Sequence, residues 1–271
     1  DVTPFVIKRG DQFKPPAPPK ITSKQFTDDF ARLQAIGASD STTRTADQTQ
    51  IALFWADGAG TATPPGHWNV IAQEIGAARH NTLAENARML AMLDAALADA
   101  GIAAWDAKFT YNYVRPVTAI RNAADDGNPA TQADPNWTPL IVTPPFPSYV
   151  SGHSTFSAAA AAALAGFFGT DRITFTSTSD AMPGVTRTFT RLSDAAAEAG
   201  ISRIYGGIHW DFDNQAGLAL GKALGRYVAK RFGGGGERHG HPDVIETPRP
   251  CAPGVFAPGK GAKREVEHAW D

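Results

Sequence analysis

The sequence predicts an all-α protein, a helical bundle with an irregular arm at each end. Apolar residues recur at helical spacing through most of the chain, and an alanine-rich run from Ser157 to Ala165 strongly favours helix. Cap residues precede several of these segments. Alternation typical of strands is confined to residues 173–190, where we expect one short hairpin.

The composition divides the chain into three parts. Residues 1–20 hold five prolines and are expected to form an extended N-terminal arm. Residues 21–232 are expected to form the helical-bundle domain, which would carry any catalysis. Residues 233–271 are rich in glycine, proline and charge, so we expect an irregular C-terminal tail.

The expected helices follow from caps, breakers and periodicity. Thr45 and Gln48 have the spacing of a capping box, and Gly58 ends the helix that they open. We expect His67 and His80, which flank the next helix, to lie at caps or on the surface. Residues 122–145 are rich in Asp, Asn, Pro and Gly and form a loop. The helices are expected at 22–36, 45–58, 68–78, 82–119, 151–168, 193–204 and 211–231.

Charge and cysteine content narrow the class of function. The net charge is -2 and the pI is about 6.4, so nothing favours a nucleic-acid or membrane-surface partner. Cys251 is the one cysteine, so no intrachain disulfide can form. The chain begins with Asp1 rather than Met, and we expect a processed form or a fragment of a longer precursor.

Residues 144–153 contain the first group of candidate site residues. Prolines hold the entering chain extended, and the alanines that follow favour helix, so Ser151, Gly152 and His153 fall at a loop-to-helix junction. Unpaired backbone N–H groups and the helix dipole favour an anion there. This stretch therefore predicts one wall of an oxyanion site.

Lys108 and Arg115 are candidates for a second wall. They are seven residues apart in a stretch predicted as helix, which would place them on one face, about 10.5 Å apart along the axis. Alone, such a pair is more typical of solvated cations. Several aromatic residues surround them, and this favours a site.

A third group lies near the end of the chain's helical part. His209 and Asp213 are four apart at a helix start, so the carboxylate can hold one ring nitrogen and leave the other as a nucleophile or ligand. Asp57, at the end of another helix, is as compatible with a solvated turn as with a cation partner. Together with Arg203, these groups would neutralise and orient a tetrahedral or trigonal-bipyramidal oxyanion.

Three segments are similar to the type 2 phosphatidic acid phosphatase superfamily, which joins phosphatases to vanadium-dependent haloperoxidases. They are Lys108-x6-Arg115-Pro116, Ser151-Gly152-His153 and Ser202-Arg203-x5-His209-x3-Asp213. The residues that flank them resemble the haloperoxidase branch, chloroperoxidases above all. The flanking motifs are Trp105-x2-Lys108, Pro144-Pro145-Phe146-Pro147-x-Tyr149, His209-Trp210-x-Phe212-Asp213 and Phe54-Trp55-Ala56-Asp57. The resemblance covers about residues 48–225, and Val150 departs from the proline usual before Ser-Gly-His.

The resemblance implies a vanadate cofactor in a helical bundle of the haloperoxidase and acid phosphatase type, and phosphate could occupy the same site. His209 would bind vanadium, His153 would be the acid–base residue, and Lys108 would assist bound peroxide. Asp57 would pair with Arg203, and Asp213 would orient His209. Trp105 and Phe146 would line the halide pocket. The vanadate oxygens would be bound by Lys108, Arg115, Ser151, Gly152 and Arg203.

The implied activity is oxidation of halide by hydrogen peroxide to a hypohalous-acid-type species. The alternatives are an acid phosphatase acting through a phosphohistidine at His209 and a non-catalytic oxyanion-binding protein. The expected partners are hydrogen peroxide, halide and small organic substrates. Relatives usually have two helical bundles, so we also expect a missing N-terminal half or a homo-oligomer. The resemblance implies a secreted or periplasmic location.

Overall fold

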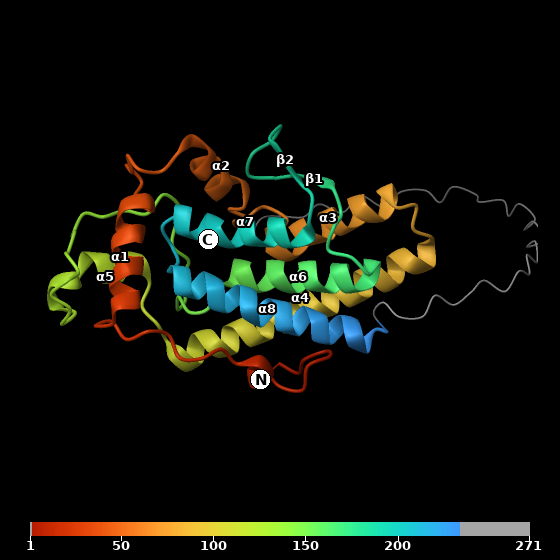
Figure 1. Cartoon of the computed structure of the whole chain (residues 1–271), viewed down its shortest axis with the longest axis horizontal. Coiled ribbons are helices and arrows are strands. Elements are labelled where there is room, and N and C mark those ends of the chain that lie inside the picture. The colour runs from red at the N-terminus through yellow and green to blue at the C-terminus, as the bar shows by residue number, and fades with distance from the viewer. Residues whose placement is uncertain (1, 234–271) are drawn as a thin grey trace, which may run out of the picture. The chain divides into compact units, whose positions relative to one another are not determined.

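The computed structural model describes residues 2–233, which form one helical unit (Figure 1). Two strands, β1 (Phe175–Thr178) and β2 (Thr186–Phe189), pair antiparallel, and the short 3-10 turns are η1 (Gly10–Phe13) and η2 (Ala123–Asp125). The all-α prediction and the predicted hairpin are confirmed. The helices are α1 (Lys24–Ile36), α2 (Ala46–Phe54), α3 (Thr63–Ala78), α4 (Leu83–Tyr111), α5 (Pro116–Arg121), α6 (Gly152–Phe168), α7 (Leu192–Tyr205) and α8 (Asp211–Arg231).

The alanine-rich helix α6 lies at the centre of the bundle. It packs most extensively against α8, and also against α7 and α4, between which it runs in Figure 1. A Cβ added at Gly221 or Gly225 of α8 would collide with the carbonyl oxygens of Thr155 and Ala159 on α6. Small residues on both helices therefore permit a close approach of α6 and α8.

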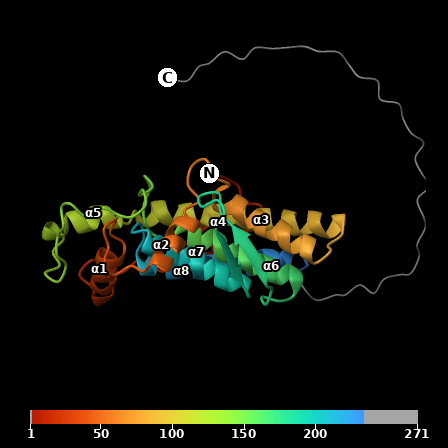
Figure 2. The same ribbon diagram turned by 90° about the horizontal axis from the view of Figure 1, so that it is seen from above.

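Two buried apolar clusters hold the helices together. One contains Phe26, Phe30 and Trp210 and joins α1 to the start of α8. The other contains Trp55 and Trp68 and joins α2 and α3 to α7 and the hairpin. Figure 2, seen from above, again shows α1 and α5 together at one end of the long helices. None of the described helices is long and apolar enough to cross a membrane.

The predicted helix over residues 82–119 is wrong, because the chain forms two helices there. Asn112 caps α4 in the left-handed conformation, with φ of 43°. Pro116 then opens α5, and its ring disfavours helix at Arg115. Gly101 lies within α4 and does not interrupt it. Lys108 and Arg115 therefore do not share one helix face, and the seven-residue spacing argument fails.

Other boundaries also move. Helix α2 ends at Phe54 rather than at Gly58, and α3 begins at Thr63, with Pro64 and Pro65 in its first turn, where proline is tolerated. The predicted tail lies, from residue 234 onward, outside the described residues. The domain boundaries stay a prediction.

The N-terminal arm is fastened to the bundle by its backbone. The N–H groups of residues 5–7 donate to the fully buried Asp99 carboxylate of α4, at 2.7, 2.8 and 2.8 Å. Tyrosine hydroxyls bind its prolines further along. The pairs are Tyr111 with Pro15 O (2.6 Å), Tyr149 with Pro16 O (2.7 Å) and Tyr113 with Pro19 O (2.8 Å).

Candidate active site

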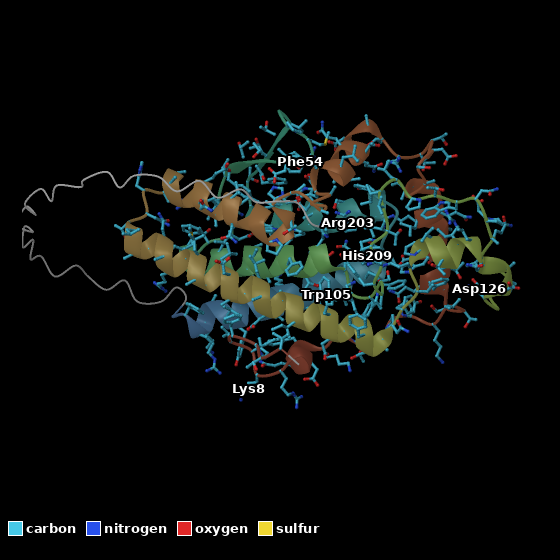
Figure 3. All side chains as sticks on the ribbon, turned by 180° about the vertical axis from the view of Figure 1, so that it is seen from behind. Lys8, Phe54, Trp105, Asp126, Arg203 and His209 are labelled. Atoms are coloured by element: carbon cyan, nitrogen blue, oxygen red, sulfur yellow. The ribbon has the colours of Figure 1, made fainter. Side chains whose placement is uncertain are left out.

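The predicted site residues gather where four helix ends meet. Helices α4 and α7 contribute their last turns, and α6 and α8 contribute their first turns. Figure 3 shows Arg203, His209 and Trp105 close to one another in the middle of the bundle. Two helix N-termini thus face a cluster of cations, and both features attract an anion.

Two buried cations are held by backbone carbonyls of one loop. Lys108 Nζ donates to the carbonyl oxygens of Pro147 and Ser148, at 2.8 and 2.9 Å. Arg115 Nε donates to the Phe146 carbonyl at 2.7 Å. Lys108 and Arg115 are 0% and 7% exposed. The loop before Ser151 therefore places both cations, although Lys108 lies in α4 and Arg115 immediately precedes α5.

Arg203 is the third buried cation. Its Nη1 donates to the Trp55 carbonyl, and it is 1% exposed. Burial lowers the pKa of Arg203 to about 10, Asp57 raises it, and Arg115 lowers it further. Burial also lowers the pKa of Arg115 to about 10, and burial followed by Arg115 lowers that of Lys108 well below its usual value. Because these charges are costly to bury together, the cluster favours a bound anion.

Unpartnered donors mark where that anion would lie. Arg115 Nη2 and Arg203 Nε are buried and have no hydrogen-bond partner among residues 2–233. His153 Nε2 is also buried without a partner in this part of the chain. Buried polar groups normally have partners, so the two guanidinium N–H groups fit an oxyanion that accepts their hydrogens, and His153 Nε2 lies free for an oxygen of the same group.

His209 is held by Asp213 as the spacing predicts. His209 Nδ1 lies 2.8 Å from Asp213 Oδ2, and Nε2 lies 3.1 Å from Arg115 Nη1. A guanidinium can only donate, so Nε2 accepts from Arg115 Nη1 with its lone pair, and Nδ1 carries the proton that Asp213 accepts. Burial, followed by Arg115 and Lys108, lowers the pKa of His209 well below its usual value. The ring is therefore neutral and suited to act as a ligand or nucleophile.

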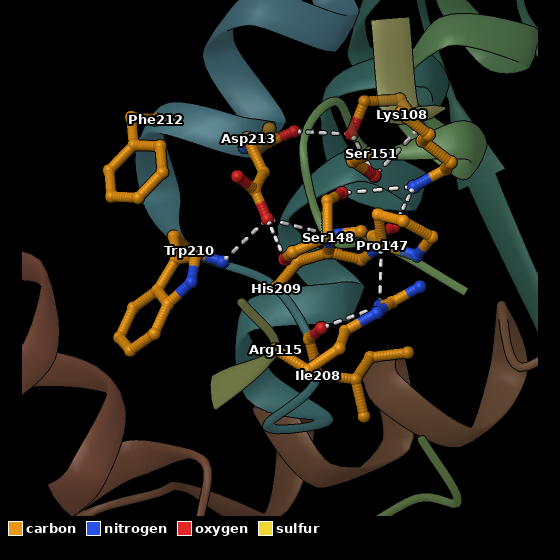
Figure 4. A network of polar contacts seen from close by, with 12 residues as sticks. Lys108, Arg115, Pro147, Ser148, Ser151, Ile208, His209, Trp210, Phe212 and Asp213 are labelled. Carbon is orange, nitrogen blue, oxygen red and sulfur yellow. Dashed lines mark hydrogen bonds and ion pairs between the residues drawn. The ribbon is translucent and has the colours of Figure 1, made fainter. Parts of the chain in front are cut away.

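Ser148 completes this arrangement, and nothing in the sequence pattern singles it out. Its hydroxyl donates a short hydrogen bond to Asp213 Oδ2, which also accepts the N–H of Trp210 at 3.2 Å (Figure 4). Burial raises the pKa of Asp213 to about 7, while Ser148 and then Lys108 lower it. Ser148 thus accepts from Lys108 through its carbonyl and donates through its hydroxyl to Asp213, the residue that orients His209.

Ser151, Gly152 and His153 begin α6 as predicted. Ser151 is the N-cap and accepts the N–H of Ser154 at 3.3 Å, and its own N–H donates to the Asp213 carbonyl at 3.1 Å. This bond ties the start of α6 to the start of α8. Burial, followed by Arg203, lowers the pKa of His153 well below its usual value, so the ring is neutral and can accept a proton.

Asp57 does not form the predicted ion pair with Arg203. Its carboxylate lies 3.0 Å from His67 Nδ1, and His67 Nε2 lies 2.9 Å from Ser177 Oγ. His67 is 5% exposed, so its expected place on the surface is wrong, whereas His80 is exposed as expected. The sequence reasoning fails here because the partner comes from the hairpin and α3, whose packing no local pattern reveals.

Trp105 and Phe146 lie together, as their predicted shared pocket requires. Their ring centroids are 5.2 Å apart, and Phe156 of α6 adds a third ring 6.2 Å from Trp105. The Phe146 ring lies 5.1 Å from Lys108 Nζ and 5.0 Å from the Arg115 guanidinium. These rings form an apolar wall beside the cations, and this wall limits the hydration of Lys108 and Arg115.

The fold and this site define a family. Residues 88–233 match the family described as the VCPO second helical-bundle domain, so the chain belongs to the vanadium haloperoxidase family. The vanadium chloroperoxidase of Curvularia inaequalis is 32% identical over 66% of this chain and 38% of its own length. The chain therefore spans well under half of that relative.

Solved structures agree with this assignment. The first bacterial vanadium-dependent iodoperoxidase is 33% identical, with a TM-score of 0.73, over 84% of this chain and 55% of that one. The holo-type bacterial vanadium-dependent chloroperoxidase is 17% identical, with a TM-score of 0.67, over 84% and 53%. The second likeness is one of fold alone. The chain spans about half the length of these two relatives.

Proposed function

We propose that the chain carries the active site of a vanadate-dependent haloperoxidase, which converts hydrogen peroxide, halide and a proton into hypohalous acid and water. The observation that carries the proposal is the set of unpartnered buried donors beside a neutral His209. Among the described residues no group of three His, Cys, Asp or Glu could hold a bare metal ion. Cationic donors and one imidazole suit an oxyanion of a metal better.

Vanadate, when bound, would supply a Lewis acid that polarises peroxide without changing its own oxidation state. His209 Nε2 would be its protein ligand, because Asp213 holds the proton on Nδ1. Its oxygens would be bound by Lys108, Arg115, Ser151, the Gly152 N–H and Arg203. Each of these groups is held by the bundle before the oxyanion arrives, so little reorganisation is needed.

His153 would move the protons. Its Nε2 is buried and unpartnered within residues 2–233, and burial together with Arg203 keeps the ring neutral. It can therefore accept a proton from peroxide and return it to the departing oxygen. Lys108 would donate to peroxide, once it exchanges one of its two carbonyl contacts for that oxygen.

Trp105 and Phe146 support a halide pocket. Their rings line the side of the site next to Lys108, where an anion would meet a cation and little water. This wall distinguishes the proposal from an acid phosphatase, in which His209 Nε2 would attack phosphorus instead. The substrates would be hydrogen peroxide, halide and small organic acceptors.

The test is halide oxidation by the purified protein with hydrogen peroxide, with and without added orthovanadate. We expect vanadate-dependent halogenation of a phenolic dye. Turnover of a phosphate ester that vanadate inhibits, with no halogenation, would establish the phosphatase instead. Binding of either oxyanion without any turnover would indicate a non-catalytic oxyanion-binding protein.

The chain covers only part of the length of each relative, and this supports one further expectation. A segment corresponding to their other half, on the same precursor or in a second copy, would complete the enzyme. Intact-mass and N-terminal analysis of the natural protein tests this. A natural product that starts at Asp1, acts alone and is monomeric would contradict it.

A further inference from the structure

Ser151, which would bind an oxyanion, is one end of a buried chain of hydrogen bonds that continues through Ser154 to Asn214. Ser151 and Ser154 lie at the start of α6, and Asn214 lies in the first turns of α8. Ser154 Oγ is 2.8 Å from Ser151 Oγ and 2.8 Å from Asn214 Oδ1. The three residues are 0%, 0% and 6% exposed. These contacts therefore decide where each hydroxyl hydrogen lies.

Glycines on two helices make room for this chain. A Cβ added at Gly200 of α7 would lie 2.3 Å from Asn214 Oδ1 and 3.2 Å from Ser154 Oγ. A Cβ added at Gly217 of α8 would lie 2.9 Å from the Cβ of Ser154. The amide and the hydroxyl thus occupy space that a larger residue at either position would fill.

Ser154 cannot donate to both neighbours, because a hydroxyl carries a single hydrogen. An amide oxygen only accepts, so an Oδ1 atom that faces Ser154 takes that hydrogen. Ser151 must then donate to Ser154, while its oxygen also accepts the Ser154 N–H at 3.3 Å. Ser151 would have no hydrogen left for an oxyanion, and its lone pair would repel one.

The opposite orientation of the amide reverses the hydrogens of the whole chain. The oxygen and the NH2 group of asparagine are similar in size and exchange places when the amide turns over. An NH2 group that faces Ser154 donates to it, and Ser154 then donates to Ser151. Ser151 accepts twice and keeps its own hydrogen for a further acceptor. An oxyanion is such an acceptor.

We propose that Asn214 is a positioning residue that presents its NH2 group to Ser154 when an oxyanion is bound, and so directs the hydroxyl hydrogen of Ser151 to that oxyanion. Ser154 transmits the orientation. Hydrogen bonds to charged acceptors are among the strong ones, so the direction of this hydroxyl affects affinity. The inference rests on the proposed function, because it concerns how one of the proposed oxyanion ligands is oriented.

Neutron diffraction from deuterium-exchanged crystals of the full chain with orthophosphate tests the orientation directly and needs no variant. We expect deuterium on Asn214 Nδ2 facing Ser154 Oγ, and the Ser151 deuterium directed at the phosphate. An Oδ1 atom facing Ser154 in that complex would overturn the proposal. A wild type that binds neither orthophosphate nor orthovanadate would instead overturn the proposed function.

A double-mutant cycle tests the effect on affinity. Asn214→Asp keeps the shape of the side chain, but at about pH 8 a carboxylate is ionised and only accepts. It should therefore fix Ser154 as its donor and Ser151 as the donor to Ser154. The same change in a Ser154→Ala background adds the same charge without a hydroxyl to transmit the orientation. Titration calorimetry with orthophosphate and with orthovanadate gives the affinities, and thermal unfolding checks that each variant is folded.

We expect Asn214→Asp to weaken oxyanion binding by about tenfold or more when Ser154 is present, since Ser151 changes from donor to acceptor. In the Ser154→Ala background the loss should be less than about threefold. Equal losses in the two backgrounds would mean that the added charge acts by itself, and would overturn the proposal. Unchanged affinity with Ser154 present would overturn it as well. If Asn214→Asp does not fold, the neutron structure decides.

Discussion

His209 Nδ1 and Asp213 Oδ2 lie 2.8 Å apart with both side chains buried, which directs His209 Nε2 toward Arg115. This pair decides which ring nitrogen carries the proton and which one presents its lone pair to the buried cations. The carboxylate is itself held by the Ser148 hydroxyl and the Trp210 N–H. The His209 ring is therefore oriented by a network that spans two loops and the first turn of α8.

Replacing His209 by alanine should abolish vanadium binding, because no other described imidazole beside the cations is held in this way. The measurement is the vanadium content of the protein after incubation with orthovanadate and gel filtration. His80→Asn is the control, because His80 is exposed and its left-handed φ of 57° suits asparagine. Vanadium retained by His209→Ala would show that the ligand is a different residue.

Ser148→Ala should weaken oxyanion binding and lower the free energy of unfolding by about 1–2 kcal/mol, since it leaves the buried Asp213 carboxylate short of a donor. The Nδ1 proton of His209 should shift in the NMR spectrum, which a loss of stability alone would not cause. Ser39→Ala, at an exposed serine, should change neither quantity. An unshifted His209 proton would remove Ser148 from the network.

Asp99→Asn should release the N-terminal arm. The carboxylate accepts three backbone N–H groups, and an amide has one oxygen to replace two, so we expect a loss of about 2 kcal/mol in the free energy of unfolding. Limited proteolysis should then cut the arm near Phe5 faster than in the wild type. Asp40→Asn, at an exposed aspartate, serves as the control. Equal cleavage rates would mean that the tyrosine contacts alone hold the arm.

Asp29 should make stability depend on pH. Burial raises its pKa from 3.8 to about 6, while the Phe212 N–H that it accepts at 3.1 Å lowers it. A carboxyl with a raised pKa binds its proton more tightly in the folded state, so its contribution falls as the pH rises from about 4 to about 6 and stays lost above that.

Asp29→Asn lacks this dependence. Its free energy of unfolding relative to the wild type should therefore increase across that window, by about 1 kcal/mol because the side chain is partly exposed. Urea unfolding at several pH values measures the difference, with the exposed Asp125→Asn as the comparison. A difference that is constant with pH would contradict the raised pKa.

Much of the site could be predicted from local pattern. Caps and helix propensity place Ser151 at the start of α6, and the four-residue spacing places Asp213 on His209, as the structure has them. The predicted common helix for Lys108 and Arg115 is wrong, yet both side chains reach the site. The two side chains converge because both donate to backbone carbonyl groups of residues 146–148. A rule based on spacing along one helix cannot predict such contacts with a distant loop.

The sequence by itself determined the helical class, the hairpin and the pairing of His209 with Asp213, because helix propensity, capping and side-chain spacing act over a few residues. Only the tertiary structure decided the partners of the other buried polar residues. Asp57 is held by His67, and Ser148 holds Asp213, through contacts 10 and 65 positions apart in the chain. Such pairs depend on how helices and loops pack. A buried polar group without a hydrogen-bond partner costs free energy, so each one pairs with a group that the packing brings close to it.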